Sequence, residues 1–167
     1  MSENSAKILY QLMSAKSMHD INYWVTKYPA DQKQSAVMST LRIVQEEHSY
    51  LTTELMDAVA DYLDMAPIGV YEVASFYTMY EHQPLGKHLV NVCTSISCLL
   101  RDSAGVVSHL ENKLGIELGG TTDDGRFTLR SVECLGACVN APMMQIDKDY
   151  HENLTPESID MALEQYQ

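Results

Sequence analysis

The chain has 167 residues, of which 46% are apolar, so it can bury a core in one domain or in a small domain with a helical extension. Its formal charge of −12 argues against nucleic acid or an anionic membrane as a partner, because phosphate contacts need clustered Lys and Arg. No stretch approaches the ~18 apolar residues of a membrane span, so no direct membrane insertion is expected.

The first half of the chain, residues 1–84, has the apolar spacing of helices. Leu51, Leu55, Val59 and Leu63 recur every fourth residue and so share one helix face. The same reasoning predicts helices over residues 18–27, 34–47 and 51–63, and a further one with Pro67 in its first turn and Val70, Val73 and Tyr77 on one face. Helices with short connections predict a small bundle. The sequence of this bundle shows no group of residues typical of acid–base or nucleophilic catalysis.

The second half, residues 85–167, has a strand and helix pattern. Residues 87–93 are apolar and β-branched and predict a strand, and further strands are expected over 126–132 and 143–146. Helices are expected over 103–114, after a loop opened by Cys98, and from Thr155-Pro156-Glu157, which suit the N-cap and the first helical positions. The fold class is therefore α+β, a helical bundle followed by an α/β domain.

Cysteine is confined to two tight pairs, Cys93-Thr-Ser-Ile-Ser-Cys98 and Cys134-Leu-Gly-Ala-Cys138. One alternative is that the two close pairs arise by chance, because buried free cysteines behave as small apolar side chains and follow no spacing rule. Disulfides need an oxidising compartment, and the N-terminus lacks a secretory signal, so a cytoplasmic location with free thiols is expected. Four thiolates then predict a metal centre. Structural zinc stays a competitor, although the spacings C-x₄-C and C-x₃-C favour an iron–sulfur cluster over the usual zinc knuckles.

The residues around the second pair narrow the choice. The segment Glu133-Cys-Leu-Gly-Ala-Cys138-Val-Asn-Ala-Pro142-Met, with Val73-Ala-Ser-Phe-Tyr-Thr-Met-Tyr80 and Pro84-Leu-Gly86, resembles the 24-kDa subunit family of respiratory complex I, the E subunits of bacterial NADH:quinone oxidoreductase. The resemblance runs from about Leu41 to the C-terminus. It implies a thioredoxin-like fold for residues 85–167, in which Cys93, Cys98, Cys134 and Cys138 ligate one [2Fe–2S] cluster.

The resemblance also implies partners. A [2Fe–2S] centre exchanges single electrons, and the chain has no G-x-G-x-x-G or P-loop for a nucleotide. NADH and FMN are therefore expected on a 51-kDa-type flavoprotein subunit, alongside other peripheral-arm subunits of a complex bound to the inner membrane on its cytoplasmic side. Relatives of the same type serve NAD-linked formate dehydrogenases and hydrogenases, which stay alternatives, as does a zinc-stabilised adaptor. Residues 1–84 are expected to dock on the partner, through an aromatic and methionine stretch for which core packing is the alternative: Tyr71, Phe76, Tyr77, Met79 and Tyr80.

Overall fold

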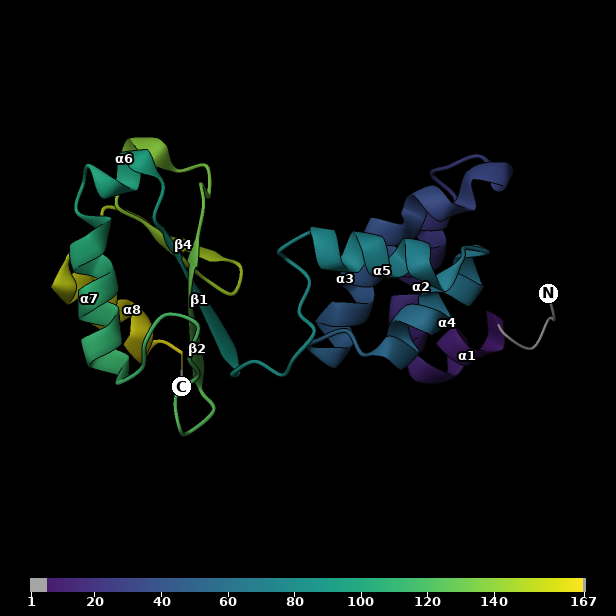
Figure 1. The fold of residues 1–167 in the computed structure, drawn as a ribbon, viewed down its shortest axis with the longest axis horizontal. Coiled ribbons are helices and arrows are strands. Elements are labelled where there is room, and N and C mark those ends of the chain that lie inside the picture. Colours follow the sequence, from purple (N-terminus) through teal and green to yellow (C-terminus); the bar gives the residue numbers. More distant parts are fainter. Residues whose placement is uncertain (1–5, 167) are drawn as a thin grey trace. The chain divides into compact units, whose positions relative to one another are not determined.

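The computed structural model describes residues 6–166, and the chain divides into two compact units, the first ending at Pro84 and the second beginning at Leu85. The first unit is helical, and the second combines helices with a sheet (Figure 1). The predicted α+β class is confirmed. Within the described part of the chain, no helix combines the length and apolar character needed to cross a membrane.

The first unit contains five α-helices and one 3₁₀ helix among its described residues. They are α1 (Ala6–Leu12), α2 (Ala15–Val25), η1 (Ala30–Ala36), α3 (Val37–His48), α4 (Thr53–Leu63) and α5 (Pro67–Phe76). Side-chain caps begin two of them, because Ser14 and Thr52 accept hydrogen bonds from the backbone N–H groups of Ser17 and Leu55.

The first unit differs from the prediction in three places. Helix α1 was not predicted, and the start of the predicted helix over 34–47 is part of the 3₁₀ helix η1. The placement of Tyr77 on a helix face is wrong. Tyr77 is the C-cap of α5 with extended backbone, and its side chain is exposed.

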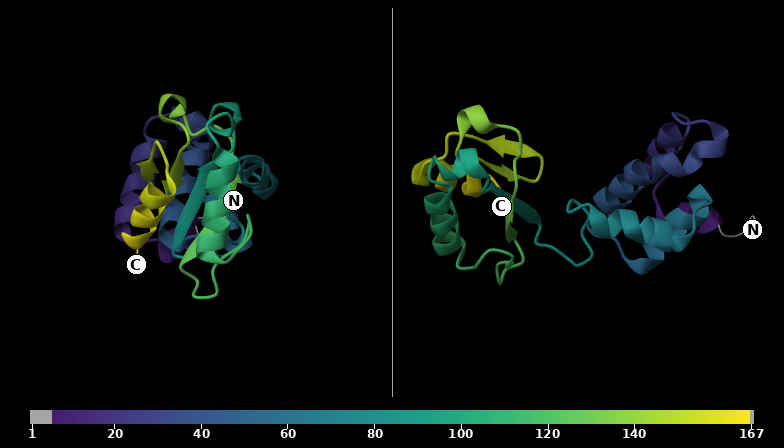
Figure 2. Two further views of the ribbon diagram at one scale, coloured as in Figure 1. Left: turned by 90° about the vertical axis from the view of Figure 1, so that its left-hand side faces the viewer. Right: turned by 45° about the horizontal axis from the view of Figure 1, so that its top comes forward.

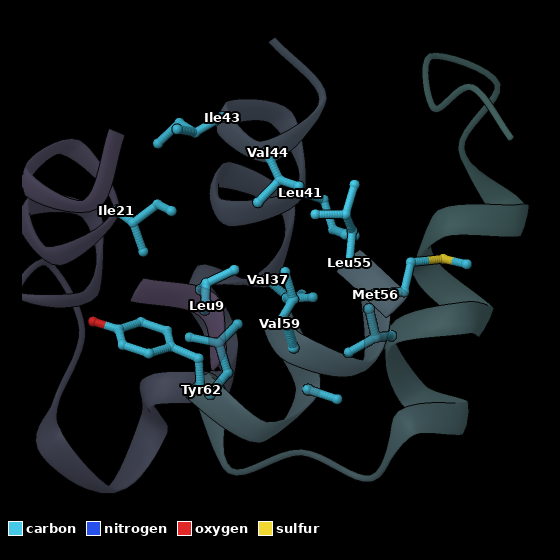
Figure 3. Packing of buried hydrophobic residues seen from close by; sticks show 14 of the residues in the cluster. Leu9, Ile21, Val37, Leu41, Ile43, Val44, Leu55, Met56, Val59 and Tyr62 are labelled. Atoms are coloured by element: carbon cyan, nitrogen blue, oxygen red, sulfur yellow. The ribbon is translucent and has the colours of Figure 1, made fainter. Parts of the chain in front are cut away.

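The core of the bundle collects the apolar faces that the spacing predicted (Figure 3). Leu41 and Val44 of α3 and Val59 of α4 are fully buried, and they are joined by Leu9 of α1 and Ile21 of α2. Each such side chain stabilises the fold by about 1.5–3 kcal/mol relative to exposure, so packing offsets the poor stability of short isolated helices.

The second unit contains a four-stranded sheet, flanked by helices. Its elements are β1 (His88–Cys93), α6 (Ile96–Leu99), α7 (Ser103–Leu114), β2 (Phe127–Val132), the 3₁₀ turn η2 (Cys138–Asn140), β3 (Met144–Ile146), β4 (Asp149–His151) and α8 (Pro156–Glu164). The strand order is β2-β1-β3-β4, with β1 parallel to β2 and the other neighbours antiparallel. The parallel pair needs a long crossover, which α6 and α7 provide.

Helices α7 and α8 lie on the same face of this sheet (Figures 1 and 2). Val90 of β1 pairs with Leu129 of β2 and with Ile146 of β3, and all three are fully buried against Leu110 of α7 and Ile159 of α8. This core fixes the register of β1 and β2, because a slip by one residue would turn the buried side chains to the other face.

The second unit also departs from the prediction at two elements. Strand β4 was not predicted, and Cys98 lies inside the short helix α6 rather than opening a loop. The backbone N–H groups of Leu99 and Leu100 bond the carbonyl groups of Ser95 and Ile96, which makes this segment one helical turn. The last helix begins as predicted, with Thr155 as N-cap and Pro156 at the first position.

Candidate metal centre

The first cysteine pair follows strand β1 and is buried. Cys93 is the last residue of β1, where its backbone N–H bonds the carbonyl of Met143 at 3.2 Å, and its side chain is only 2% exposed. Cys98 is held in α6 and is 1% exposed. The two thiols lie within a small apolar cluster that includes Ala141 and Met143.

The second pair follows strand β2 and is exposed. Cys134 Sγ and Cys138 Sγ lie 3.4 Å apart, and both side chains are open to solvent. Gly136 stands between them with φ +87°, a conformation that favours glycine, and its N–H donates to Cys134 Sγ at 3.3 Å. Tyr150 of β4 binds the loop between the two cysteines, because its hydroxyl donates to the Leu135 carbonyl at 2.6 Å.

The fold brings the two pairs together at one edge of the sheet. Parallel neighbouring strands end at the same edge, and Cys93 pairs in register with Val132, the last residue of β2. Helix α6 and the turn η2 accordingly lie side by side at one end of the unit (Figures 1 and 2).

Hydrogen bonds then tie the two cysteine loops to each other. The Thr94 N–H bonds the Val132 carbonyl at 3.0 Å, and the Ser95 hydroxyl donates to the Glu133 carboxylate at 3.0 Å. A hydrogen bond from Ser97 to the thiol of Cys138 links α6 directly to the second pair. Ser95, Ser97 and Glu133 are therefore parts of the site that the cysteine spacing alone could not reveal.

The environments of the thiols differ. Burial raises the pKa of Cys98 to about 11, and the neighbouring thiol of Cys93 adds to the shift. The Gly136 N–H lowers the pKa of Cys134, whereas the hydrogen bond with Cys134 raises the pKa of Cys138. A buried thiol with a raised pKa stays protonated near neutral pH, so a metal that binds Cys98 must displace its proton.

The donor set fits a binuclear cluster. Four thiols come as two close pairs at one edge of the sheet. A [2Fe–2S] cluster takes two thiolates on each iron, which matches this grouping. The Gly136 N–H supplies the hydrogen-bond donor that a negatively charged sulfur ligand requires.

Comparison with known proteins assigns the family. The family model of the thioredoxin-like [2Fe–2S] ferredoxins matches residues 21–167. The chain belongs to this family. The match includes the whole second unit, so the predicted thioredoxin-like fold is confirmed, and it also includes most of the helical bundle.

Curated relatives point to one respiratory enzyme. The chain is 42% identical over 147 residues to the E 2 subunit of the NADH-quinone oxidoreductase of Rhizobium meliloti, covering 88% of this chain and 86% of the relative. It is 38% identical over 164 residues to the E subunit of the same enzyme in Rickettsia conorii, covering 98% of both chains. It is also 44% identical over 142 residues to the mitochondrial NADH dehydrogenase [ubiquinone] flavoprotein 2 of Dictyostelium discoideum, covering 84% of this chain and 58% of that protein.

Solved structures agree with the fold. A chain of an NAD⁺-reducing [NiFe]-hydrogenase in its air-oxidised state superposes with a TM-score of 0.65 at 21% identity. The match covers 76% of this chain but only 22% of the hydrogenase chain. At this identity the likeness concerns the fold.

Proposed function

We propose that the protein is the electron-transfer E subunit of an NADH:quinone oxidoreductase. The observation that carries the proposal is the meeting of two thiol pairs at one sheet edge, in a chain that belongs to the thioredoxin-like [2Fe–2S] ferredoxins. The relatives named as E subunits, which align over most or all of this chain, support the choice of complex. The chain itself has no nucleotide-binding motif, so NADH and FMN belong to a partner protein.

In this proposal each thiol pair binds one iron. Cys93 and Cys98 hold the inner iron, in the apolar cluster that excludes water, and Cys134 and Cys138 hold the outer iron at the surface. The cluster, when bound, supplies the exchange of a single electron. The Gly136 N–H and the Ser97 hydroxyl direct positive hydrogen toward the sulfur ligands, which favours the negative charge there.

The surface around the cysteines is suited to a protein partner. Ile96, Leu99 and Leu100 of α6 and its end are exposed, and so is Val139, which follows Cys138 and is 96% exposed. We call these four residues the apolar rim. A protein that covers the apolar rim would exclude water from the outer iron and bring its own redox centre close. The proposed occupant is the FMN- and NADH-binding subunit.

The helical unit offers a second contact surface, which includes fewer residues than the sequence predicted. Phe76 is 78% exposed and Met79 is also exposed, which suits docking. Tyr80, by contrast, packs in the bundle core and donates to the Met38 carbonyl at 2.9 Å, and the Tyr71 hydroxyl bonds the Asp57 carboxylate. Phe76, Met79 and the likewise exposed Tyr77 thus remain the proposed docking residues, in the peripheral arm on the cytoplasmic side of the membrane.

Two other functions use the same geometry. The fold likeness to an NAD⁺-reducing hydrogenase keeps the equivalent subunit of an NAD-linked hydrogenase or formate dehydrogenase as the alternative. A zinc-stabilised adaptor would use the same four thiols in the same two pairs, and the match to the [2Fe–2S] ferredoxin family favours the cluster.

Serine variants test the ligands, with the chain purified without air. Cys93→Ser, Cys98→Ser, Cys134→Ser and Cys138→Ser should each lower the iron and sulfide bound per chain. A variant that keeps a full complement of iron and sulfide with an unchanged spectrum would remove that residue from the ligand set. Ser97→Ala serves as the matched control. It should keep the cluster, because it removes only a hydrogen bond to one ligand.

A charge on the apolar rim tests the partner. Val139→Glu should retain the cluster but lose the flavin-containing subunit that co-purifies with the wild-type chain from its own cell extract. Leu118→Glu, on an exposed apolar residue after α7, is the control and should retain the partner. Equal retention by both variants would contradict docking at the rim.

A further inference from the structure

The two thiol pairs differ in access. Cys93 and Cys98 are enclosed, while Cys134 and Cys138 face solvent on a surface loop. A dissolved oxidant therefore reaches one pair and not the other whenever no cluster occupies the four thiols. The consequence concerns the newly made chain, before the cluster and the partner cover the outer pair.

The outer pair is also placed to form a disulfide. The sulfur atoms of Cys134 and Cys138 lie 3.4 Å apart, and a disulfide bond requires about 2.05 Å, so small side-chain rotations and loop adjustments suffice. Only Leu135, Gly136 and Ala137 separate the two residues, and no strand or helix includes these three. The loop can therefore follow the sulfur atoms without disturbing the sheet.

The inner pair lacks this freedom. Cys93 is fixed as the last residue of β1, between Val132 of β2 and the carbonyl of Met143, and Cys98 is fixed within α6. A disulfide from either of them to the outer loop would pull a buried side chain out of its apolar cluster. Burial therefore protects the inner thiols both from the oxidant and from exchange with the outer ones.

We propose that the cluster-free chain carries a reversible disulfide between Cys134 and Cys138, formed by a hydroperoxide, that blocks cluster insertion until a thiol reduces it. One thiol attacks the peroxide, giving a sulfenic acid and water, or an alcohol from an organic peroxide. The second thiol displaces a further water from the sulfenic acid as the S–S bond forms. In total two thiols lose two electrons and two protons, and the peroxide is reduced by the same two electrons.

The disulfide removes both ligands of the outer iron and leaves the inner pair as thiols. A disulfide at an exposed, short loop is readily reduced, because closing few residues stabilises it little and the bond is accessible to thiolates. The chain would thus be held unloaded but undamaged during oxidative stress. This consequence for loading rests on the four-cysteine cluster proposed above, whereas the disulfide itself does not.

Thiol mapping of the full-length, cluster-free chain tests the first part. The chain is reduced, freed of metal with a chelator, exposed to hydrogen peroxide, and alkylated before and after reduction for peptide mass spectrometry. The expected product has one disulfide that links Cys134 to Cys138, with Cys93 and Cys98 alkylated as free thiols after unfolding. The double variant Cys93→Ser/Cys98→Ser should give the same disulfide, and Cys138→Ser should give none within the chain. A disulfide that involves Cys93 or Cys98, or sulfinic acid without any disulfide, would overturn the inference.

Cluster transfer tests the second part. A [2Fe–2S] scaffold protein in thiol-free buffer is the donor, and absorbance follows transfer to the chain. The reduced chain should take up the cluster, the oxidised chain should take up less than a tenth as much, and a thiol reductant should restore the uptake. Equal uptake by both forms would overturn the block on loading. No uptake by the reduced chain would instead contradict the proposed function, and the disulfide found by mass spectrometry would stand.

Discussion

Substitution of Gly136 probes the link between loop conformation and cluster binding. Gly136 has φ +87°, and an added Cβ would meet no atom within 4 Å, so Gly136→Ala introduces backbone strain and no steric clash. An L-residue in left-handed conformation costs about 1–2 kcal/mol. For a unit of this size, each 1 kcal/mol shifts the melting temperature by about 4–8 °C, so the loss should lower it by about 4–16 °C.

Gly119 provides a matched control in the same unit. It has φ +88° and equally open surroundings, but it lies in the turn before β2, away from the four thiols. Gly119→Ala should therefore lower the melting temperature of the cluster-free chain by a similar amount. Thermal unfolding followed by circular dichroism makes the comparison.

The two variants should differ in how fast they release the cluster. If the alanine at position 136 relaxes from positive φ, its N–H turns away from Cys134 Sγ, to which Gly136 donates at 3.3 Å. Loss of about 1 kcal/mol of hydrogen bonding to a charged sulfur corresponds to about fivefold in equilibrium. Iron release to a chelator, read from bleaching of the cluster absorbance, should accelerate about fivefold in Gly136→Ala and stay at the wild-type rate in Gly119→Ala. Equal release rates in both variants would show that the Gly136 N–H does not help to retain the cluster.

Three further substitutions test the fold. Leu9→Ala should lower the free energy of unfolding of the bundle, measured in urea, by about 2–5 kcal/mol, because the Leu9 side chain is fully buried. Its neighbour Ile8 is half-exposed, so Ile8→Ala should change this free energy by less than about 0.5 kcal/mol. Gly86→Ala should destabilise the second unit by about 1–3 kcal/mol, because the added Cβ would lie 2.8 Å from the backbone of β2. Unchanged stability would show that the chain at Gly86 does not pack tightly against β2. Asp160→Asn should lower the melting temperature at neutral pH, because Lys113 holds the pKa of Asp160 below its ordinary value. The ionised Asp160 carboxylate stabilises the fold at any pH above the ordinary pKa of an aspartate. The difference in melting temperature between the variant and the wild type should therefore vanish as the pH falls through the lowered pKa.

Long periodic segments were the part of the fold that sequence could predict. The helix over 103–114 matches α7 residue for residue, because Val106 and Leu110 mark its buried face and Gly115 ends it in left-handed conformation. The α+β class follows from such segments. The apolar strand β3 was predicted although it is short, but its neighbour β4 was not. Strand β4 is only Asp149–His151, a polar tripeptide that becomes a strand by pairing with β3.

For the candidate site, the sequence predicts a set of residues but does not indicate their surroundings. Spacing and resemblance together singled out Cys93, Cys98, Cys134 and Cys138, and the parallel pairing of β1 and β2 explains why the two loops meet. Nothing in the spacing indicates that one pair is buried and the other exposed. That difference arises from Met143 and Ala141, which a loop distant in sequence brings over the inner thiols. It decides which pair an oxidant can reach.

Electron paramagnetic resonance spectroscopy with metal analysis shows whether the four cysteines bind one [2Fe–2S] cluster. The chain is purified without air and reduced with dithionite, and its electron paramagnetic resonance spectrum at low temperature is recorded with iron, sulfide and zinc analysis. We expect an axial or rhombic signal with about two irons and two sulfides per chain. Stoichiometric zinc without a signal would contradict this expectation and leave a structural module.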